Sequence, residues 1–296
     1  MHDLDIVTSA EMSSAARLDG QVCLVTGATA GIGRHTALAL AERGAAVILV
    51  GRDAGRLARV ERAIRRSAPG AHTRSFVADF ASQAAVRLMA HRVLDAVPAI
   101  HVLINNAATV TMARREAVDG LELQFAVNHL APFLLTNLLL DRLAGSAPSR
   151  VITVASQVER GGTIDFDDLQ VRRHYDGQRA YRQSKLANIL FTRELARRTR
   201  GRSIAAISLH PGVYSTRLLD ALMGWSSFVT RIRGRNLPGP ALGAEVVLRA
   251  ASMELAGLAI VHLHEGVIAD SSDQARDDHL ALRLWNESAR LTGLTA

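Results

Sequence analysis

The sequence predicts an α/β protein built on a doubly wound parallel sheet with helices on both faces. Short β-branched runs alternate with longer amphipathic stretches along nearly the whole chain. The runs are almost continuously apolar, which is typical of parallel strands covered on both sides. A glycine-rich turn joins the first run to the first helical stretch, a further mark of this architecture. We find no internal repeat or low-complexity linker, so the 296 residues are expected to form a single domain.

Seven runs are predicted to be strands, and helical stretches fill the gaps between them. In chain order the strands are residues 22–26, 46–50, 74–78, 101–105, 150–155, 204–210 and 259–265. We expect a polar tail over residues 1–17 and the domain itself over 18–296. Residues 213–240 fit neither pattern, and their Gly, Ser, Trp and Pro content predicts a lid over a substrate site.

The composition limits the function classes. With 48% hydrophobic residues the chain can bury a large core, and the sole cysteine, Cys23, permits neither an intrachain disulfide nor a cysteine-based zinc site. No stretch has the 18 apolar residues typical of a membrane span, so we expect a cytoplasmic protein without membrane insertion. The net charge is +7, but the arginines are dispersed and aromatic residues make up only 4%, which disfavours a nucleic-acid partner.

Three glycines mark a candidate phosphate loop. Gly27, Gly31 and Gly33 lie in "TGATAGIG", between the first strand and the first helix. Glycine there permits a tight turn and lets backbone N–H groups and the helix N-terminus approach a pyrophosphate. In this strand–turn–helix context the pattern predicts a dinucleotide site.

The end of the second strand indicates which dinucleotide binds. An acid there would bind the adenosine ribose of NAD, but the sequence is "VGRD", with Gly51 in the likely acid position. Arg52 and Arg34 could instead clamp a 2′-phosphate, which favours NADPH. Asp53 is the counter-argument, since it could meet a ribose hydroxyl; we interpret it as the cap of the following helix.

Lys185 is the only lysine in a chain with 35 basic side chains, so the other 34 are arginines. Tyr181 precedes it by four residues on a predicted helix, which places both side chains on one face. An adjacent ammonium favours the phenolate and lowers the pKa of a tyrosine from about 10. A compact ammonium can also pass a proton, which arginine cannot. The pair therefore predicts a proton-transfer centre.

The chain resembles the short-chain dehydrogenase/reductase family, with its Rossmann-type sheet, and within it the retinol-dehydrogenase-like members. The resemblance extends from Leu18 to Leu294. It rests on "TGATAGIG", "ADF" at Asp79, "NNAA" from Asn105 to Ala108, "VNHLAPFLLTNLLL", "YRQSKLANILFTRELA", "HPGVYST" and "LWNESARLTGL". Two departures are Ala155, where relatives often have serine, and "NNAA" in place of the commoner "NNAG".

The resemblance implies roles for individual residues. Asn128 would hold a relay water, Ser156 would hydrogen-bond the substrate oxygen, Tyr181 would donate or accept the proton, and Lys185 would lower the tyrosine pKa and bind the ribose. Together with these last two, the implied cofactor-binding residues are Gly27, Thr29, Ala30, Gly31, Ile32, Gly33, Arg34, Arg52, Asp79, Phe80, Asn106, Ala107, Pro211, Gly212, Val213 and Thr216.

The expected function is an NADPH-dependent ketoreductase or alcohol dehydrogenase that acts on an apolar small molecule such as a specialised metabolite. Reduction of an activated C=C bond and a non-catalytic NADP-binding regulator remain alternatives. A homodimer or homotetramer is expected. His262 and His264 alternate on a predicted strand, but the sequence offers no obvious third ligand, so no metal site is expected.

Overall fold

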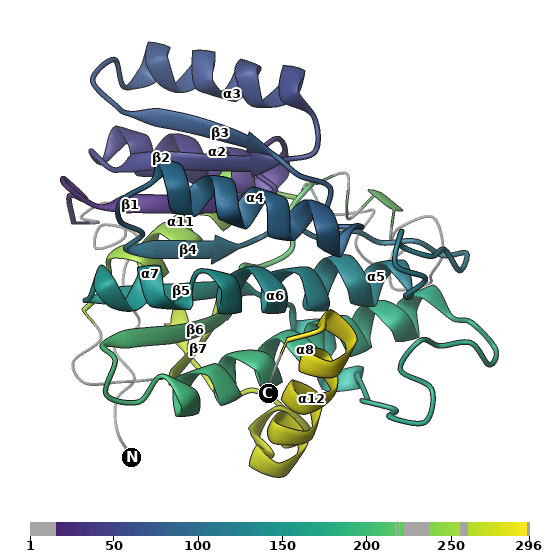
Figure 1. Cartoon of the computed structure of the whole chain (residues 1–296). Helices are drawn as coiled ribbons and strands as arrows, with labels where there is room; N and C mark the ends of the chain where they lie inside the picture. Colours follow the sequence, from purple (N-terminus) through teal and green to yellow (C-terminus); the bar gives the residue numbers. More distant parts are fainter. Residues whose placement is uncertain (1–15, 217, 219, 222–236, 255–259, 295–296) are drawn as a thin grey trace.

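The computed structural model describes residues 16–294, apart from 217, 219, 222–236 and 255–259. These residues form one eight-stranded sheet with the order β3-β2-β1-β4-β5-β6-β7-β8 (Figure 1). The strands are β1 (Val22–Thr26), β2 (Ala46–Gly51), β3 (Thr73–Val77), β4 (Val102–Asn105), β5 (Ser149–Val154), β6 (Ile204–His210), β7 (Ile260–His264) and β8 (Val267–Ile268). The predicted doubly wound α/β class is confirmed, and each of the seven predicted strands lies within one residue of its expected bounds.

The eighth strand was not predicted. β8 has only two residues and runs antiparallel to β7, whereas the other neighbouring strands are parallel. Glu265 and Gly266 form the two-residue turn between them, with φ angles of 51° and 89°. Two positive φ angles are typical of the tight turn that matches strand twist in a hairpin. So short a strand leaves no periodic signal in the sequence.

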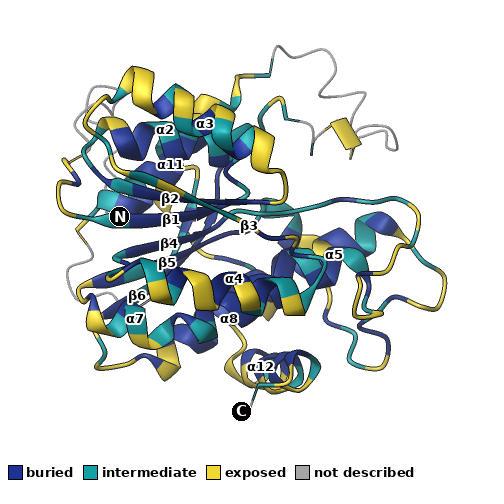
Figure 2. Cartoon of the chain, turned by 45° about the horizontal axis from the view of Figure 1, so that its top comes forward, coloured by how far each residue is buried: buried dark blue, intermediate teal, exposed yellow. Residues whose placement is uncertain are grey.

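Helices cover both faces of the sheet (Figure 2). On one face lie α2 (Gly31–Glu42), α3 (Ala54–Ser67) and α11 (Pro240–Ser252); on the other lie α4 (Gln83–Ala96), α6 (Ala131–Leu138) and α8 (Gly177–Arg198), with α12 (Asp278–Thr292) packed on α8. Shorter helical segments are α5 (Leu123–Phe125), α7 (Leu140–Gly145), a π-helical turn (Ala126–Leu130) and 3₁₀ turns (Gln157–Gly161 and Gln274–Arg276). None of the described helices has both the length and the apolar character required to span a bilayer.

The order of the strands positions the functional site. The chain moves outward from β1 to β2 and β3, then returns to the other side of β1 with β4. The connection after β1 leads to α2 on one face of the sheet, and the connection after β4 leads to α6 on the other face, so a crevice opens at the carboxyl edge where the two directions part. Ligands of doubly wound proteins bind at such a switch point.

Three aromatic rings join α6, α8 and α12. Phe133 lies edge-on to Trp285, with ring centroids 4.8 Å apart, and to Phe191, at 5.7 Å. Phe191 stacks on Trp285 at 5.9 Å, and Phe133 is 1% exposed. This cluster fastens the C-terminal helix to α8, which carries Tyr181 and Lys185.

We expect Phe133→Ala to lower the free energy of unfolding by about 3–5 kcal/mol, because the truncation leaves a cavity among three packed helices. Denaturant titration of the purified protein measures the change. Leu282→Ala on α12 serves as the control, because Leu282 is 37% exposed and its truncation should change stability by about 0.5 kcal/mol or less. Equal losses in the two variants would contradict the role of the cluster.

Candidate active site

A cleft of about 1760 Å³ opens at the carboxyl edge of the sheet. It contains every site residue predicted from the sequence except Asn128. The predicted residues that line it are Gly27, Thr29, Ala30, Gly31, Ile32, Gly33, Arg34, Arg52, Asp79, Phe80, Asn106, Ala107, Ser156, Tyr181, Lys185, Pro211, Gly212, Val213 and Thr216. The fold thus brings together residues that follow six different strands, β1 to β6, and two residues of α8.

The turn after β1 lies so close to the loop after β4 that it has no room for side chains. A Cβ atom on Gly27 would lie 2.9 Å from the Cα of Ala107, and one on Gly33 would lie 2.3 Å from Nδ2 of Asn106. Gly27 also has a φ of 67°, which favours glycine. Asn106 Nδ2 donates a hydrogen bond to the carbonyl of Thr26 at 2.9 Å, which keeps the two loops in contact.

The N-terminus of α2 points to an anionic ligand. Ala30 occupies the N-cap position and offers no side-chain hydrogen bond to the first turn. The uncapped N–H groups of that turn and the positive end of the helix dipole are suited to bind a phosphate. Gly31 in this turn has a φ of 53° and lines the cleft. The residues present therefore fit the pyrophosphate of a dinucleotide.

Arginines surround the side of the cleft next to β2. Arg34 and Arg52 line it, and neither forms an ion pair with any described residue. A Cβ atom on Gly51 would lie 2.7 Å from Cγ2 of Thr29, so a larger residue at this position would have to displace that methyl group. Asp53 does not line the cleft; its carboxylate accepts a hydrogen bond from the N–H of Arg56 at 2.9 Å and caps α3, as predicted.

Four arginines of α3 that line the cleft were not predicted from the sequence. Arg56, Arg59, Arg62 and Arg66 repeat at intervals of three or four residues along α3 and therefore lie on one face of the helix. Arg56 also pairs with Asp53, with Nε and Oδ2 3.4 Å apart. The helical spacing was the available signal, but only the packing of α3 shows that this face borders the cleft. The row extends the positive charge beyond Arg34 and Arg52.

Tyr181 and Lys185 lie on one face of α8, as predicted, and both line the cleft. Tyr181 is 5% exposed and Lys185 is 2% exposed. The Lys185 ammonium donates a hydrogen bond to the carbonyl of Val154, at the end of β5, at 2.8 Å. Its Nζ lies 5.6 Å from the centre of the Tyr181 ring. The lysine thus ties the catalytic helix to the neighbouring strand.

Burial, rather than the ammonium, controls the protonation of this pair. It raises the pKa of Tyr181 above its usual value near 10, and it lowers the pKa of Lys185 to about 8. The expected lowering of the tyrosine pKa by Lys185 is not found, because desolvation of the phenolate dominates. Tyr181 is therefore a neutral phenol at neutral pH, which is the form that can give up a proton.

Ser156 follows β5 and is half-buried on the cleft wall. Its hydroxyl caps the 3₁₀ turn at Gln157–Gly161 by accepting a hydrogen bond from the N–H of Val158, at 3.5 Å. That contact is long and uses only an acceptor site of the hydroxyl. The O–H hydrogen therefore stays free to donate to a ligand in the cleft.

Asn128 lies behind the cleft rather than on its wall. It is 1% exposed within the π-helical turn, and its side chain accepts from the N–H of Thr109 at 2.7 Å. Its Nδ2 donates to the carbonyl of Thr109 and to the hydroxyl of Ser184, both at 3.0 Å. These contacts brace the loop after β4 against α8. They assign the Asn128 side chain a positioning role, and the predicted relay water would have to use another group.

The predicted lid falls only partly within the described residues. Val213 and Thr216 line the cleft, and so do Leu218 and Ala221. Residues 217, 219 and 222–236 lie outside the described part of the chain, so the lid remains a prediction.

Comparisons with known proteins identify the family of this chain. The family model of the short chain dehydrogenases matches residues 21–226. Retinol dehydrogenase 13 of Homo sapiens is 40% identical, in an alignment that covers 99% of this chain and 90% of that protein. Retinol dehydrogenase 11 of Homo sapiens is 38% identical, in an alignment that covers 98% of this chain and 91% of that protein. The crystal structure of an uncharacterized protein from Mycobacterium paratuberculosis is 35% identical, covers 96% of this chain and 97% of its own, and has a TM-score of 0.77.

The fold and the matched family define a class of protein, the oxidoreductases that use a nicotinamide dinucleotide to act on alcohol or carbonyl groups. The chain belongs to the short-chain dehydrogenase/reductase family, and its relatives place it among the retinol-dehydrogenase-like members.

We expect Lys185→Arg to reduce kcat more than tenfold, equivalent to about 1.4 kcal/mol or more, although the charge is retained. The planar guanidinium is larger than the ammonium and has no room in a site that is 2% exposed. Steady-state kinetics of the purified variants measures the change. Arg65→Lys, on the exposed side of α3 and outside the cleft, should keep full activity. Full activity of Lys185→Arg would exclude a special role for the lysine.

Proposed function

We propose that this protein is an NADPH-dependent reductase that converts the carbonyl group of an apolar small molecule to an alcohol. The observation that carries the proposal is the convergence of Ser156, Tyr181 and Lys185 on the cleft that also holds the glycine loop. When bound, the nicotinamide supplies the hydride. Tyr181 gives its proton to the substrate oxygen, and Ser156 donates a hydrogen bond to the same oxygen as negative charge develops there.

Carbonyl reduction requires a proton donor beside the oxygen, and the neutral phenol of Tyr181 is such a donor. Burial raises the pKa of this phenol above its usual value near 10. Lys185, with its pKa lowered to about 8, is a group that can return a proton to the tyrosine near neutral pH. Both side chains are nearly excluded from water, which strengthens hydrogen bonds to a developing alkoxide.

The choice of an apolar substrate rests on apolar residues of the cleft wall. Val110, Leu123, Val127 and Val158 line the cleft, and together they offer an apolar surface to a ligand. The two human relatives are named as retinol dehydrogenases, and retinol is an apolar alcohol, which agrees with this surface. We further propose a cytoplasmic location, since the lone cysteine Cys23 is buried and free.

The proposal is tested with deuterium-labelled NADPH and a panel of apolar ketones, aldehydes and enones. We expect deuterium on the carbinol carbon of the product. We also expect Ser156→Ala to lower kcat by about a hundredfold with little change in NADPH affinity, because it removes a donor to the oxyanion. Ser67→Ala, an exposed serine at the end of α3, is the matched control.

Two outcomes would replace the proposal. Deuterium found only beta to an intact carbonyl, with Ser156→Ala still active, would establish reduction of a C=C bond. A non-catalytic regulator would be favoured if the protein binds NADPH tightly but turns over no member of the panel. In that case the NADPH affinity should also be unchanged in the Tyr181→Phe variant.

The preference for NADPH is proposed to come from Arg34 and Arg52. A structure of a protein proposed to be a short chain dehydrogenase, from Escherichia coli CFT073, is complexed with NADPH; it is 22% identical and indicates a shared fold (TM-score 0.67). We expect Arg52→Ala to weaken NADPH binding by about 1.5–3 kcal/mol, the value of a charge-assisted phosphate contact, and to leave NADH binding unchanged. Fluorescence titration of both cofactors, with Arg65→Ala as control, checks this. Equal affinities of the wild type for NADH and NADPH would rule out the proposed NADPH preference.

A further inference from the structure

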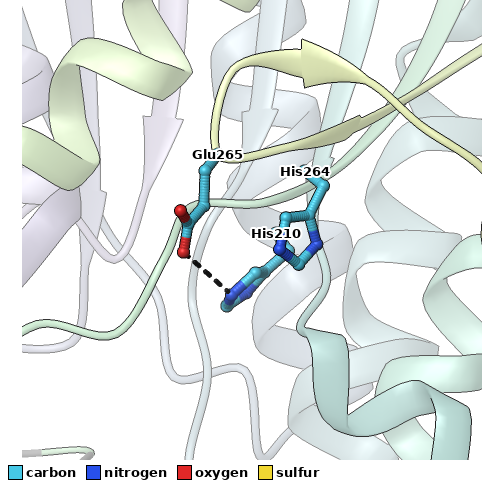
Figure 3. Close-up of side chains that lie close together, drawn as sticks. All are labelled: His210, His264 and Glu265. Atoms are coloured by element: carbon cyan, nitrogen blue, oxygen red, sulfur yellow. Dashed lines mark ion pairs between the residues drawn. The ribbon is translucent and has the colours of Figure 1, made fainter.

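A cluster of two histidines and one glutamate lies at the carboxyl ends of β6 and β7. His210 and His264 are register partners on these two strands, and their ring centroids are 4.9 Å apart. Glu265 follows His264 in the turn to β8, and its N–H donates to the carbonyl of His210 at 2.9 Å. Figure 3 shows the Glu265 carboxylate directed at the His210 ring, with Oε1 4.0 Å from Nε2. Neighbouring strands and a tight turn thus hold all three residues together.

His210 is a buried polar side chain with unsatisfied hydrogen-bonding groups. It is 2% exposed, and within the described part of the chain neither of its ring nitrogens has a hydrogen-bond partner. Unsatisfied groups of this kind are rare and costly, and coordination of an ion is one of the few physical reasons to keep one.

The neighbouring pair, Ser208 and His262, is satisfied by a hydrogen bond between the two side chains. Two residues earlier on each strand, His262 lies opposite Ser208, and the serine hydroxyl is 2.9 Å from Nδ1 of His262. In the sequence, His262 and His264 were considered as a pair, and no metal site was expected because no third ligand was evident. In the fold His262 bonds to Ser208, and the partners of His264 are instead His210 and Glu265.

We propose that His210, His264 and Glu265 form a binding site for a single zinc ion. One potential ligand atom from each residue lies within 4.8 Å of the other two, and this is the one such group among the described residues. Two imidazoles and a carboxylate are ligands that Zn²⁺ accepts. Bonds of about 2.0–2.1 Å in a tetrahedral site separate the ligand atoms by about 3.4 Å, so the cluster has to contract slightly.

The surroundings allow that contraction and give the ion a route in. The Glu265 side chain is 58% exposed and can move toward the rings, and His264 is only half-buried. The three protein ligands leave a fourth position for water or a small molecule. His210 is also part of the cleft wall, directly before the Pro211–Gly212–Val213 segment. A dication here would therefore add positive charge to the cleft wall beside Lys185 and the expected cofactor-binding segment.

The test is isothermal titration of the full-length protein, free of any polyhistidine tag, with Zn²⁺. We expect one saturable site per chain, and no comparable site for Mg²⁺. His264→Ala and Glu265→Gln should each weaken zinc binding at least about tenfold, because each removes one of three ligands. His262→Ala is the matched control, a histidine on the same strand and face that should retain the wild-type affinity. Co²⁺ should give the intense visible bands of a four-coordinate site in the wild type and lose them in Glu265→Gln.

Two results would overturn the proposal: no one-to-one zinc site in the wild type, or equal weakening by His262→Ala and His264→Ala. Glu265→Gln changes an exposed side chain with almost no change in volume, so it remains informative if a histidine variant fails to fold. Thermal unfolding of each unliganded variant checks that the fold is intact.

An effect of zinc on turnover rests additionally on the proposed function. We expect zinc to inhibit the wild type at concentrations that fill the site, and His264→Ala to resist that inhibition. Zinc binding in a protein that turns over no carbonyl substrate would contradict the proposed function and leave the metal site standing. Normal turnover without zinc binding would contradict the metal site and leave the proposed function standing.

Discussion

The close approach of the β1 and β4 loops is the constraint on which the site depends. The Thr26 hydroxyl donates to the carbonyl of Ile104 at 3.2 Å and accepts from the N–H groups of Asn106 and Ala107 at 3.0 and 3.1 Å. This network holds the two loops together, and only glycine at positions 27 and 33 leaves room for it. The start of α2 is thereby aimed into the crevice, where its N–H groups are accessible to an anion.

The chemistry proposed for this crevice depends on the burial of Tyr181 and Lys185, which are 5% and 2% exposed. α8 crosses behind β5 and β6, and the Val154 carbonyl fixes the ammonium of Lys185. Burial in this position makes Tyr181 a phenol and brings the pKa of Lys185 down to about 8. The aromatic contacts of α6, α8 and α12 fasten α8 to its neighbouring helices.

Much of the fold was predictable because parallel strands covered on both faces produce strong apolar runs, and all seven such runs became strands. β8 was not, because a two-residue strand carries no pattern. Most candidate site residues were also identified, since the glycine turn and the Tyr181–Lys185 spacing reflect local geometry. Asn128 shows the limit: its motif was recognised, but its side chain is committed to Thr109 and Ser184, which lie distant in sequence.

The sequence by itself determined the α/β class, the phosphate turn and the shared helical face of Tyr181 and Lys185, because each follows from the periodicity or conformational freedom of neighbouring residues. The tertiary structure decided which helix faces and strand ends meet. It placed the arginine row of α3 along the cleft and made burial the dominant influence on Tyr181. It also joined His210 to His264 and Glu265, which lie more than fifty residues further along the chain, because β6 and β7 pair in parallel register.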